Sequence, residues 1–171
     1  MNSERRRLLV VRHAKSAWPP GVPDRSRPLA PRGQSDAPRM GERIGAAVGL
    51  PDVVVVSPAE RARQTWDLIS QAFGPIPDQR IDDRVYDDWG SELIDVVRDL
   101  PDSARTAILV GHEPGVSQLV LSLADRSQPS LRARIDAKFP TCAVALLTAP
   151  LPWEGFVPGC ATLAEFLTPK D

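Results

Sequence analysis

The stretch Val53-Val54-Val55-Val56-Ser57-Pro58-Ala59-Glu60 joins a short, wholly apolar run to the start of a helix. Consecutive β-branched residues are typical of a strand that is buried on both faces of a parallel sheet. Ser57 is a preferred N-cap residue, Pro58 suits the first helical position, and Glu60 completes a capping box. The stretch therefore predicts a buried strand that runs directly into a helix, which is the repeating unit of α/β folds.

The same alternation of strand and helix continues in both directions along the chain. Further strands are predicted at Leu8–Val11, Ala107–Val110 and Cys142–Leu147, a weaker one at Ile81–Val85, and a last short strand or helix within Ala161–Leu167. Apolar residues recur at helical spacing between these runs. The helix stripes are Ala37, Met40, Ile44 and Val48; Ala62, Trp66, Ile69 and Phe73; the apolar residues of Ser91–Leu100; and Val116, Leu119, Val120 and Leu123 after Pro114. This order predicts a mostly parallel central sheet with helices on both faces.

The composition is that of a globular protein, and its 171 residues suit a single domain, which we expect to span residues 1–171. A formal net charge of -1 disfavours a general nucleic-acid or membrane-surface binder. The two cysteines provide no disulfide framework, and the apolar runs are too short to span a bilayer. We therefore expect a reduced, cytoplasmic protein with neither nucleic acid nor membrane as its partner.

Polar residues that could carry chemistry follow the predicted strands. Arg12 and His13 come directly after the first strand, and His112 follows Ala107–Val110. Arg61 lies on the first turn of the helix after Val53–Val56. The chain has only two histidines, and both fall at strand ends. Because ligands of open α/β sheets bind outside the carboxyl ends of the strands, we expect these side chains to converge on one site.

The composition of this predicted site favours an anion, and phosphate in particular. Helix N-termini offer free amides and a positive dipole, and the planar fork of arginine matches phosphate oxygens. The same positive charge disfavours a metal cation, so we expect no metal and no cofactor. Gly-rich nucleotide loops and a Gly-x-Ser-x-Gly elbow are absent from the sequence, and neither cysteine is followed by arginine six positions later. Histidine is then the expected nucleophile toward phosphorus.

Four segments of the chain resemble the motifs of the histidine phosphatase (phosphoglycerate mutase-like) superfamily. They are Arg12-His13-Ala14-Lys15-Ser16, Arg27-Pro28-Leu29 with Arg32-Gly33, Ser57-Pro58-x-x-Arg61-Ala62-x-Gln64-Thr65, and Val110-Gly111-His112-Glu113-Pro114. The resemblance covers Leu8 to Leu147, and the chain length and the Arg-Pro-Leu variant point to the SixA-like branch, whose named member is a phosphohistidine phosphatase. It implies a three-layer α/β/α sandwich with a mostly parallel central sheet.

The resemblance also implies roles for individual residues. His13 would attack the phosphoryl group and become phosphohistidine, and Arg12 would bind the phosphate. Arg61 and His112 would both contact the transferred phosphoryl group. Phosphoryl transfer depends mainly on positioning and on stabilising charge at the equatorial oxygens, which these cations could supply without a metal. We expect His13 to be neutral at its attacking nitrogen, with a backbone hydrogen bond at the other.

Other residues near these motifs have either a binding or a structural role in the resemblance. Arg27 would be a further phosphate or substrate contact, with a structural role in its loop as the alternative. Lys15 and Ser16 would either touch the phosphate or simply line the loop. Ser57 is expected to act first as a helix cap.

A general acid that protonates an oxygen leaving group has no clear counterpart in this sequence, although other branches of the superfamily carry one. Candidates are Asp87, Asp88 and Glu92, which follow the weak strand, and Glu113 beside His112. Imidazole leaves phosphorus with less help, because the P–N bond is labile and easily protonated. A missing acid is thus compatible with a phosphohistidine or a similarly activated substrate.

The sequence leads to the hypothesis of a metal-independent phosphatase that forms a phosphohistidine intermediate on His13 and acts on phosphohistidine in a protein. One alternative is a phosphatase for small phosphorylated metabolites, and another is a non-catalytic, phosphate-binding regulatory module. The expected partner is a phosphorylated protein or a small phosphorylated substrate, and the default assembly is a monomer. Specificity would lie in the loops Trp18–Arg27, Gly74–Gly90 and Asp125–Pro140.

Overall fold

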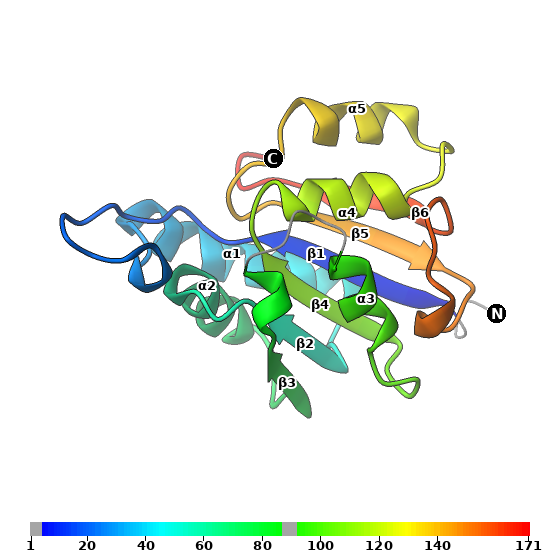
Figure 1. Ribbon diagram of the computed structural model, residues 1–171, viewed down its shortest axis with the longest axis horizontal. Coiled ribbons are helices and arrows are strands. Elements are labelled where there is room, and N and C mark those ends of the chain that lie inside the picture. The colour runs from blue at the N-terminus through cyan, green and yellow to red at the C-terminus, as the bar shows by residue number, and fades with distance from the viewer. Residues whose placement is uncertain (1–4, 87–91) are drawn as a thin grey trace.

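The computed structural model of the chain describes residues 5–86 and 92–171. Its centre is a six-stranded sheet with the order β3-β2-β4-β1-β5-β6 (Figure 1). The strands are β1 (Arg6–Arg12), β2 (Val53–Val56), β3 (Asp78–Ile81), β4 (Thr106–Gly111), β5 (Val144–Ala149) and β6 (Thr162–Leu167). The sheet thus places β1, which carries the first motif, at an interior position between β4 and β5.

Most strands of the sheet run in one direction. β1 pairs in parallel with β4, β4 with β2, and β2 with β3. β5 is antiparallel to both of its neighbours, β1 and β6. Among the described strands, therefore, β5 alone runs against the others, and the prediction of a mostly parallel sheet is confirmed.

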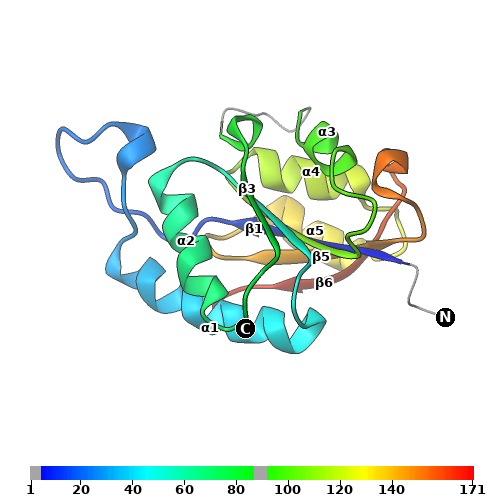
Figure 2. The same ribbon diagram turned by 90° about the horizontal axis from the view of Figure 1, so that it is seen from below.

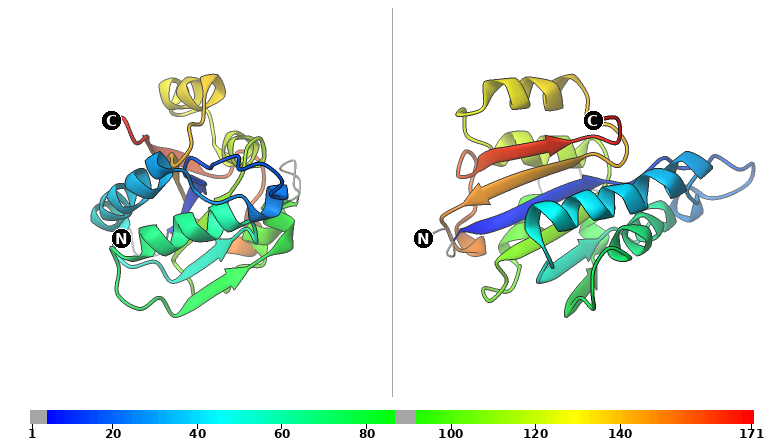
Figure 3. Two further views of the ribbon diagram at one scale, coloured as in Figure 1. Left: turned by 90° about the vertical axis from the view of Figure 1, so that its left-hand side faces the viewer. Right: turned by 180° about the vertical axis from the view of Figure 1, so that it is seen from behind.

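Helices cover the sheet on both faces, as the sequence pattern predicted. α1 (Pro31–Val48) and α2 (Glu60–Ser70) pack on one face, while α3 (Leu93–Arg98), α4 (Gly115–Leu123) and α5 (Pro129–Ala137) lie on the other side. Figure 2 shows the sheet nearly edge-on between these two helical layers, and Figure 3 shows α1 and α2 in front of the strands. The short 3-10 helices are η2 (Asp24–Ser26), η3 (Asp83–Val85) and η4 (Trp153–Gly155). The expected three-layer α/β/α sandwich is confirmed.

Alternate side chains of the interior strands enter different cores. In β1, Leu8 and Val10 pack with the α3 and α4 side, whereas Leu9 and Val11 pack with α1 and α2. All of these side chains are fully buried. Burial on both faces explains why the interior strands appear in the sequence as continuous apolar runs.

Local predictions failed at three places, and at the first two of them the sequence signal is weak. The weak strand lies at Asp78–Ile81 rather than Ile81–Val85, because it is a polar, mostly exposed edge strand without an apolar run. The segment Asp125–Pro140, predicted to be a loop, contains α5, whose only buried residue is Ile135. Such a helix has almost no apolar stripe to detect.

The start of α2 is the third correction. Ala59, rather than Ser57, is the N-cap residue, and no side chain caps this helix. The Glu60 carboxylate accepts from Gln64 Nε2 at 3.0 Å instead of completing a capping box.

None of the described helices is long and apolar enough to cross a bilayer.

Candidate active site

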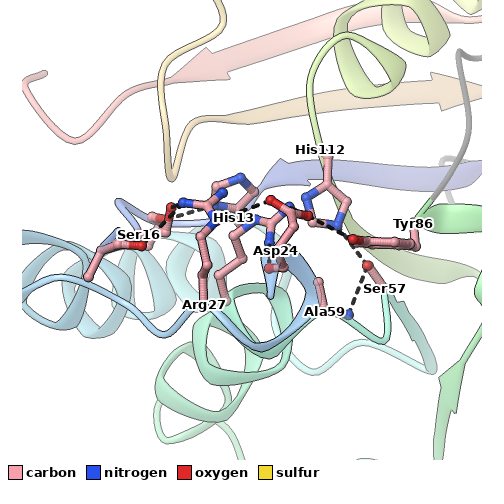
Figure 4. Close-up of polar contacts among 11 residues, drawn as sticks. His13, Ser16, Asp24, Arg27, Ser57, Ala59, Tyr86 and His112 are labelled. Atoms are coloured by element: carbon pink, nitrogen blue, oxygen red, sulfur yellow. Dashed lines mark hydrogen bonds and ion pairs between the residues drawn. The ribbon is translucent and has the colours of Figure 1, made fainter. Parts of the chain in front are cut away.

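The segments that follow β1, β2 and β4 meet at one edge of the sheet, because these strands are parallel. Main-chain hydrogen bonds tie the segments together just beyond the strands. His13 N–H donates to the Gly111 carbonyl and Ser57 N–H donates to the Val110 carbonyl, each at 3.0 Å. The side chains of His13, Ser57 and His112 consequently gather at this edge (Figure 4). The convergence expected from the strand ends is therefore present.

His13 is held as a neutral imidazole with one ring nitrogen free. Its Nδ1 lies 2.7 Å from the Ala14 carbonyl oxygen, which can only accept, so Nδ1 carries the hydrogen and Nε2 keeps a lone pair. Burial lowers the pKa of His13 to about 3, with further lowering from His112 and from two nearby arginines. A neutral imidazole with one free nitrogen is able to attack phosphorus at physiological pH.

His112 packs against His13, with 5.1 Å between the ring centroids. Burial, followed by the charge of Arg61, lowers the pKa of His112 to about 4. Its Nε2 lies 2.7 Å from Ser57 Oγ, which also accepts from Ala59 N–H at 3.2 Å. If the Ser57 hydroxyl donates to Nε2, the neutral ring carries its hydrogen on Nδ1, where it could donate to a ligand oxygen.

Arg12 and Arg61 are each held at one end of the guanidinium group. Arg12 Nη1 donates to the Phe139 carbonyl at 2.8 Å. Arg61 Nη1 and Nη2 donate to the carbonyl and to Oδ2 of Asp24, at 2.8 and 3.1 Å. The Nε atoms of both arginines are buried without a hydrogen-bond partner among the described residues. In each arginine, Nε is therefore free, and Nε belongs to a guanidinium edge that can bind two phosphate oxygens at once.

The buried side-chain nitrogens without a partner cluster at this site. In residues 5–86 and 92–171 they are Nε of Arg12, Nε of Arg61, Nδ1 of His112 and, at the opposite end of β1, Nε of Arg6. Buried polar atoms are nearly always hydrogen-bonded, so a cluster of buried nitrogens without a partner requires an explanation. An anion with several acceptor oxygens would provide partners for the three nitrogens at the edge of the sheet.

Arg27, Ser16 and Lys15, for which the sequence leaves a binding and a structural role open, lie around this cluster. Arg27 is buried; its Nη1 donates to Ser16 Oγ at 2.9 Å, and its guanidinium stacks 3.4 Å from the ring centroid of Trp18. Lys15 is exposed, and its main-chain carbonyl accepts a hydrogen bond from Ala30 N–H. Of this group, the structure thus brings Arg27 and Ser16 together.

α2 positions the loops that carry these residues. Thr65 Oγ1 accepts from Ala14 N–H at 2.9 Å and donates to the Arg61 carbonyl at 2.6 Å. Gln64 Oε1 accepts from Leu29 N–H at 2.8 Å. The Gln-Thr pair of the motif therefore fastens the loop after β1 and the Arg-Pro-Leu segment to the same helix.

α1 also lies unusually close to the loop after β1. A Cβ atom on Gly33 would stand 2.2 Å from the Lys15 carbonyl oxygen, well inside van der Waals contact. Only glycine allows the first turn of the helix to approach the loop in this way. The glycine of the second motif is thus explained by packing rather than by chemistry.

Two contributors to the site carry no signal in the sequence. Asp24 accepts from both Arg61 and Arg27, and Tyr86 Oη donates to Asp24 Oδ2 at 2.7 Å. The Tyr86 ring also packs edge-on to His112, with centroids 5.7 Å apart. Both residues lie in connections without periodicity, so only the tertiary structure identifies them.

The general-acid candidates differ in their position and hydrogen bonds. Asp87 and Asp88 lie outside the described residues. Glu92 is exposed and immediately precedes α3. Glu113 accepts from Ser117 N–H at 2.9 Å and from Ser117 Oγ at 2.7 Å, so it is engaged at the start of α4.

A groove of about 410 Å³ adjoins the site between α4 and α5. Its polar lining includes Arg12, Glu113, Ser117, Gln118, Asp136 and Lys138. Arg12 belongs to both the groove and the cluster of buried nitrogens without a partner. A ligand with an anionic group at His13 could therefore extend its remaining part into this groove.

Comparison with known proteins gives consistent matches over most of the chain. The model of the histidine phosphatase superfamily (branch 1) matches residues 8–147. An uncharacterized protein of Mycobacterium tuberculosis (strain H37Rv) is 38% identical over 162 residues, which cover 94% of this chain and all of the relative.

Solved structures match over nearly the whole length. A protein assigned as the phosphohistidine phosphatase SixA from Nakamurella multipartitia superimposes with a TM-score of 0.86 and 25% identity, covering 99% of both chains. A second protein with this assignment, from Agrobacterium tumefaciens, gives a TM-score of 0.80 and 26% identity, covering 95% of this chain and 97% of its own.

Proposed function

Because the chain belongs to the histidine phosphatase superfamily and is a phosphoryl-group hydrolase with a SixA-like fold, we propose that it is a phosphohistidine phosphatase. In this proposal His13 is the nucleophile, no metal is required, and the substrate is phosphohistidine in a protein. The assignment of the two similar structures as SixA supports this substrate class.

The observation that carries the proposal is the set of buried side-chain nitrogens without a partner around His13. Nε of Arg12, Nε of Arg61 and Nδ1 of His112 have no partner among the described residues. Preorganised donors stabilise the charge that develops on equatorial phosphoryl oxygens, and in a site shielded from water they do so strongly. The arginines would supply the positive charge that a metal ion supplies in other phosphoryl-transfer enzymes.

The reaction would proceed in two displacements on phosphorus. First, the lone pair on His13 Nε2 forms the new P–N bond while the bond from phosphorus to the substrate imidazole breaks. The departing nitrogen keeps the electron pair and takes a proton from water. A second water then attacks the phosphorus of phospho-His13 and gives its proton to the hydroxide left by the first, so that the P–N bond breaks, inorganic phosphate is released and the lone pair returns to Nε2.

The carboxylates near the site support an activated substrate. Glu113 is occupied by Ser117, and hydrogen bonds from Tyr86 and two arginines lower the pKa of Asp24 to about 2. Neither is arranged as a proton donor in the described structure. An imidazole leaving group, unlike an alkoxide, needs little protonation from the enzyme, so phosphohistidine suits this arrangement.

The deciding experiment measures phosphate release from a phosphohistidine-bearing protein and from a panel of small phosphoesters, with a chelator present. Wild type, His13→Ala and Arg61→Gln would be compared with Arg80→Gln, which removes an exposed arginine of β3 that is paired with Asp78. We expect a preference for phosphohistidine, complete loss in His13→Ala, a large loss in Arg61→Gln and none in Arg80→Gln.

Other outcomes would redirect the proposal. Faster turnover of a small phosphoester would favour the metabolite phosphatase, whose substrate could use the polar groove beside Arg12. Phosphate binding without turnover, and without radiolabelled phosphate on His13, would leave a non-catalytic binding module.

A further inference from the structure

Asp24 is the point at which three parts of the site meet. It lies on η2, in the connection between β1 and α1. Its carboxylate accepts from Arg27 Nε at 3.1 Å, from Arg61 Nη2 at 3.1 Å and from Tyr86 Oη at 2.7 Å. Figure 4 shows Asp24 with Arg27 on one side and Tyr86 on the other.

All of these contacts use Asp24 as an acceptor. The hydrogen bond from Tyr86 contributes most to lowering its pKa to about 2, followed by the charge and hydrogen bond of Arg61 and the hydrogen bond of Arg27. The group is consequently a carboxylate at neutral pH and has no proton to give. Because its side chain is 51% exposed, water screens these ion pairs, and their main effect is on geometry.

The contacts with Arg61 fix which edge of its guanidinium faces the ligand. The Asp24 carbonyl accepts from Nη1, and Oδ2 accepts from Nη2. Nε, which is buried and unpaired, remains available beside the second hydrogen of Nη2. An arginine held from its far end in this way cannot rotate its bidentate edge away from the phosphoryl group.

Arg27 is fixed by the same carboxylate from a second direction. Asp24 accepts from its Nε, while Ser16 Oγ and the Ala17 carbonyl accept from its Nη1. Between two neighbouring cations the carboxylate also offsets their mutual repulsion. Without it, both side chains would sample more rotamers, and a ligand would have to order them on binding.

We propose that Asp24 is a positioning residue for phosphoryl transfer, which holds Arg61 and Arg27 in the orientation that receives the phosphoryl oxygens beside His13. The inference rests on the proposed phosphatase function. It differs from a catalytic role because the carboxylate acts through the arginines and contacts neither the nucleophile nor the phosphorus.

The test replaces Asp24→Asn and measures the affinity for inorganic phosphate by calorimetry, together with kcat and KM on phosphohistidine, an aryl phosphate and an alkyl phosphate. Loss of a charged hydrogen-bond acceptor predicts phosphate binding weakened about tenfold. Any rate loss should be the same for every substrate that is turned over, whatever its leaving group. Asp24→Glu, which keeps the charge, should recover part of the affinity.

The matched control is Asp83→Asn. The Asp83 carboxylate pairs at 3.1 Å with Arg25, which lies on η2 next to Asp24. It does not touch Arg61 or Arg27 in the described structure. We expect wild-type phosphate affinity in this variant, and unchanged melting temperatures in both. An equal loss in Asp83→Asn would mean that only the folding of the connection matters, and the inference would fail.

Two further results would overturn the inference. Tighter phosphate binding by Asp24→Asn would make Asp24 a competitor for the arginines, and a loss confined to alkyl phosphate would make it a general acid. Phosphate binding is measured without turnover, so it is independent of the proposed function. A wild type that binds phosphate but never hydrolyses phosphohistidine would refute the phosphatase proposal alone.

Discussion

At the scale of single residues, several side chains of the site bond to the protein through one polar atom and leave another polar atom available to a ligand. His13 gives Nδ1 to the Ala14 carbonyl and keeps Nε2 free. His112 Nε2 is hydrogen-bonded to Ser57, and its Nδ1 has no partner among the described residues. Likewise, Arg61 Nη2 is bonded to Asp24, while its Nε has no such partner. The hydrogen bond from one atom to the protein fixes the orientation of the side chain. In a histidine ring it also fixes the tautomer, and so decides whether the other nitrogen is a donor or an acceptor.

Ser57→Ala tests this arrangement at His112. Without the hydroxyl, nothing on Ser57 can favour the tautomer that carries the hydrogen on His112 Nδ1, so the hydrogen bond proposed from Nδ1 to the phosphoryl group should weaken. We expect kcat/KM to fall about tenfold, the usual effect of one lost hydrogen bond to a charged group. Nitrogen NMR of the labelled histidine should report a shift in tautomer.

The matched control for that change is Ser70→Ala, which removes a hydroxyl that donates to the Asp67 carbonyl at the end of α2, outside the lining of the groove. It should leave both kcat/KM and the tautomer near wild type. An unchanged tautomer in Ser57→Ala would show that another group sets the state of His112.

The residues that could be predicted from the sequence are those at strand ends. Arg12, His13 and His112 follow apolar runs, so their convergence follows from the rule for parallel sheets. Asp24 and Tyr86 could not be found in this way, because a loop has no periodicity that relates it to a strand. Their positions depend on long-range contacts between η2, α2 and η3.

At the scale of elements, helices act as the frame that sets loop positions. α2 fastens the loop after β1 through Thr65, and α1 approaches the same loop through Gly33. The loops of the site are thus held from the helical layer as well as from the sheet.

Gly33→Ala tests the contribution of α1. The new Cβ would stand 2.2 Å from the Lys15 carbonyl, which is main chain and cannot swing aside. We expect a loss of about 1–3 kcal/mol in the free energy of unfolding, as for other overpacked sites, and reduced phosphatase activity because the loop after His13 must move. Urea unfolding and activity assays would measure the two effects.

Gly45→Ala in the same helix is the matched control. Its Cβ would lie 3.5 Å from Phe73 Cε1, an ordinary contact. Alanine in a helix interior is favoured over glycine, so we expect stability to rise by about 0.5–1 kcal/mol with activity unchanged. Equal effects at both positions would contradict the close approach of α1 to the loop.

Elements also differ in how far the sequence determines them. β2 lies at its predicted bounds, because four buried valines permit little else. α5 lies outside the predicted helices and β3 lies apart from its predicted position, because α5 has a single buried residue and β3 is at the sheet edge. Sequence patterns record burial, so elements with little burial leave little trace.

At the scale of the whole molecule, the reversed direction of β5 completes the site. Because β5 is antiparallel to β1, its first residues lie at the edge where β1 ends. Cys142 N–H accordingly lies 3.1 Å from the carbonyls of both Arg12 and His13, and the Phe139 carbonyl holds Arg12. The sequence predicted the strand but not its direction, so this side of the site could not be foreseen.

The fold as a whole buries both histidines in a neutral state, and this links its stability to pH. Their pKa values, about 3 for His13 and about 4 for His112, lie below the value of about 6.5 for an unfolded chain. Between these limits the unfolded state binds more protons than the folded state, so acid favours unfolding. The histidine contribution to stability should therefore be complete near pH 7 and fall as the pH is lowered from there toward 4.

Urea unfolding between pH 7 and pH 5 would measure this dependence, with a slope of up to about 1.4 kcal/mol per pH unit for each histidine. Asp24, whose pKa is lowered to about 2, adds a loss of stability only at lower pH, so the window isolates the histidines. His13→Gln cannot titrate and should remove about half of the slope, and the further change His112→Gln should remove the rest. A slope that survives both changes would mean that the histidines are not buried neutral, and the same result would remove the basis for His13 as a neutral nucleophile.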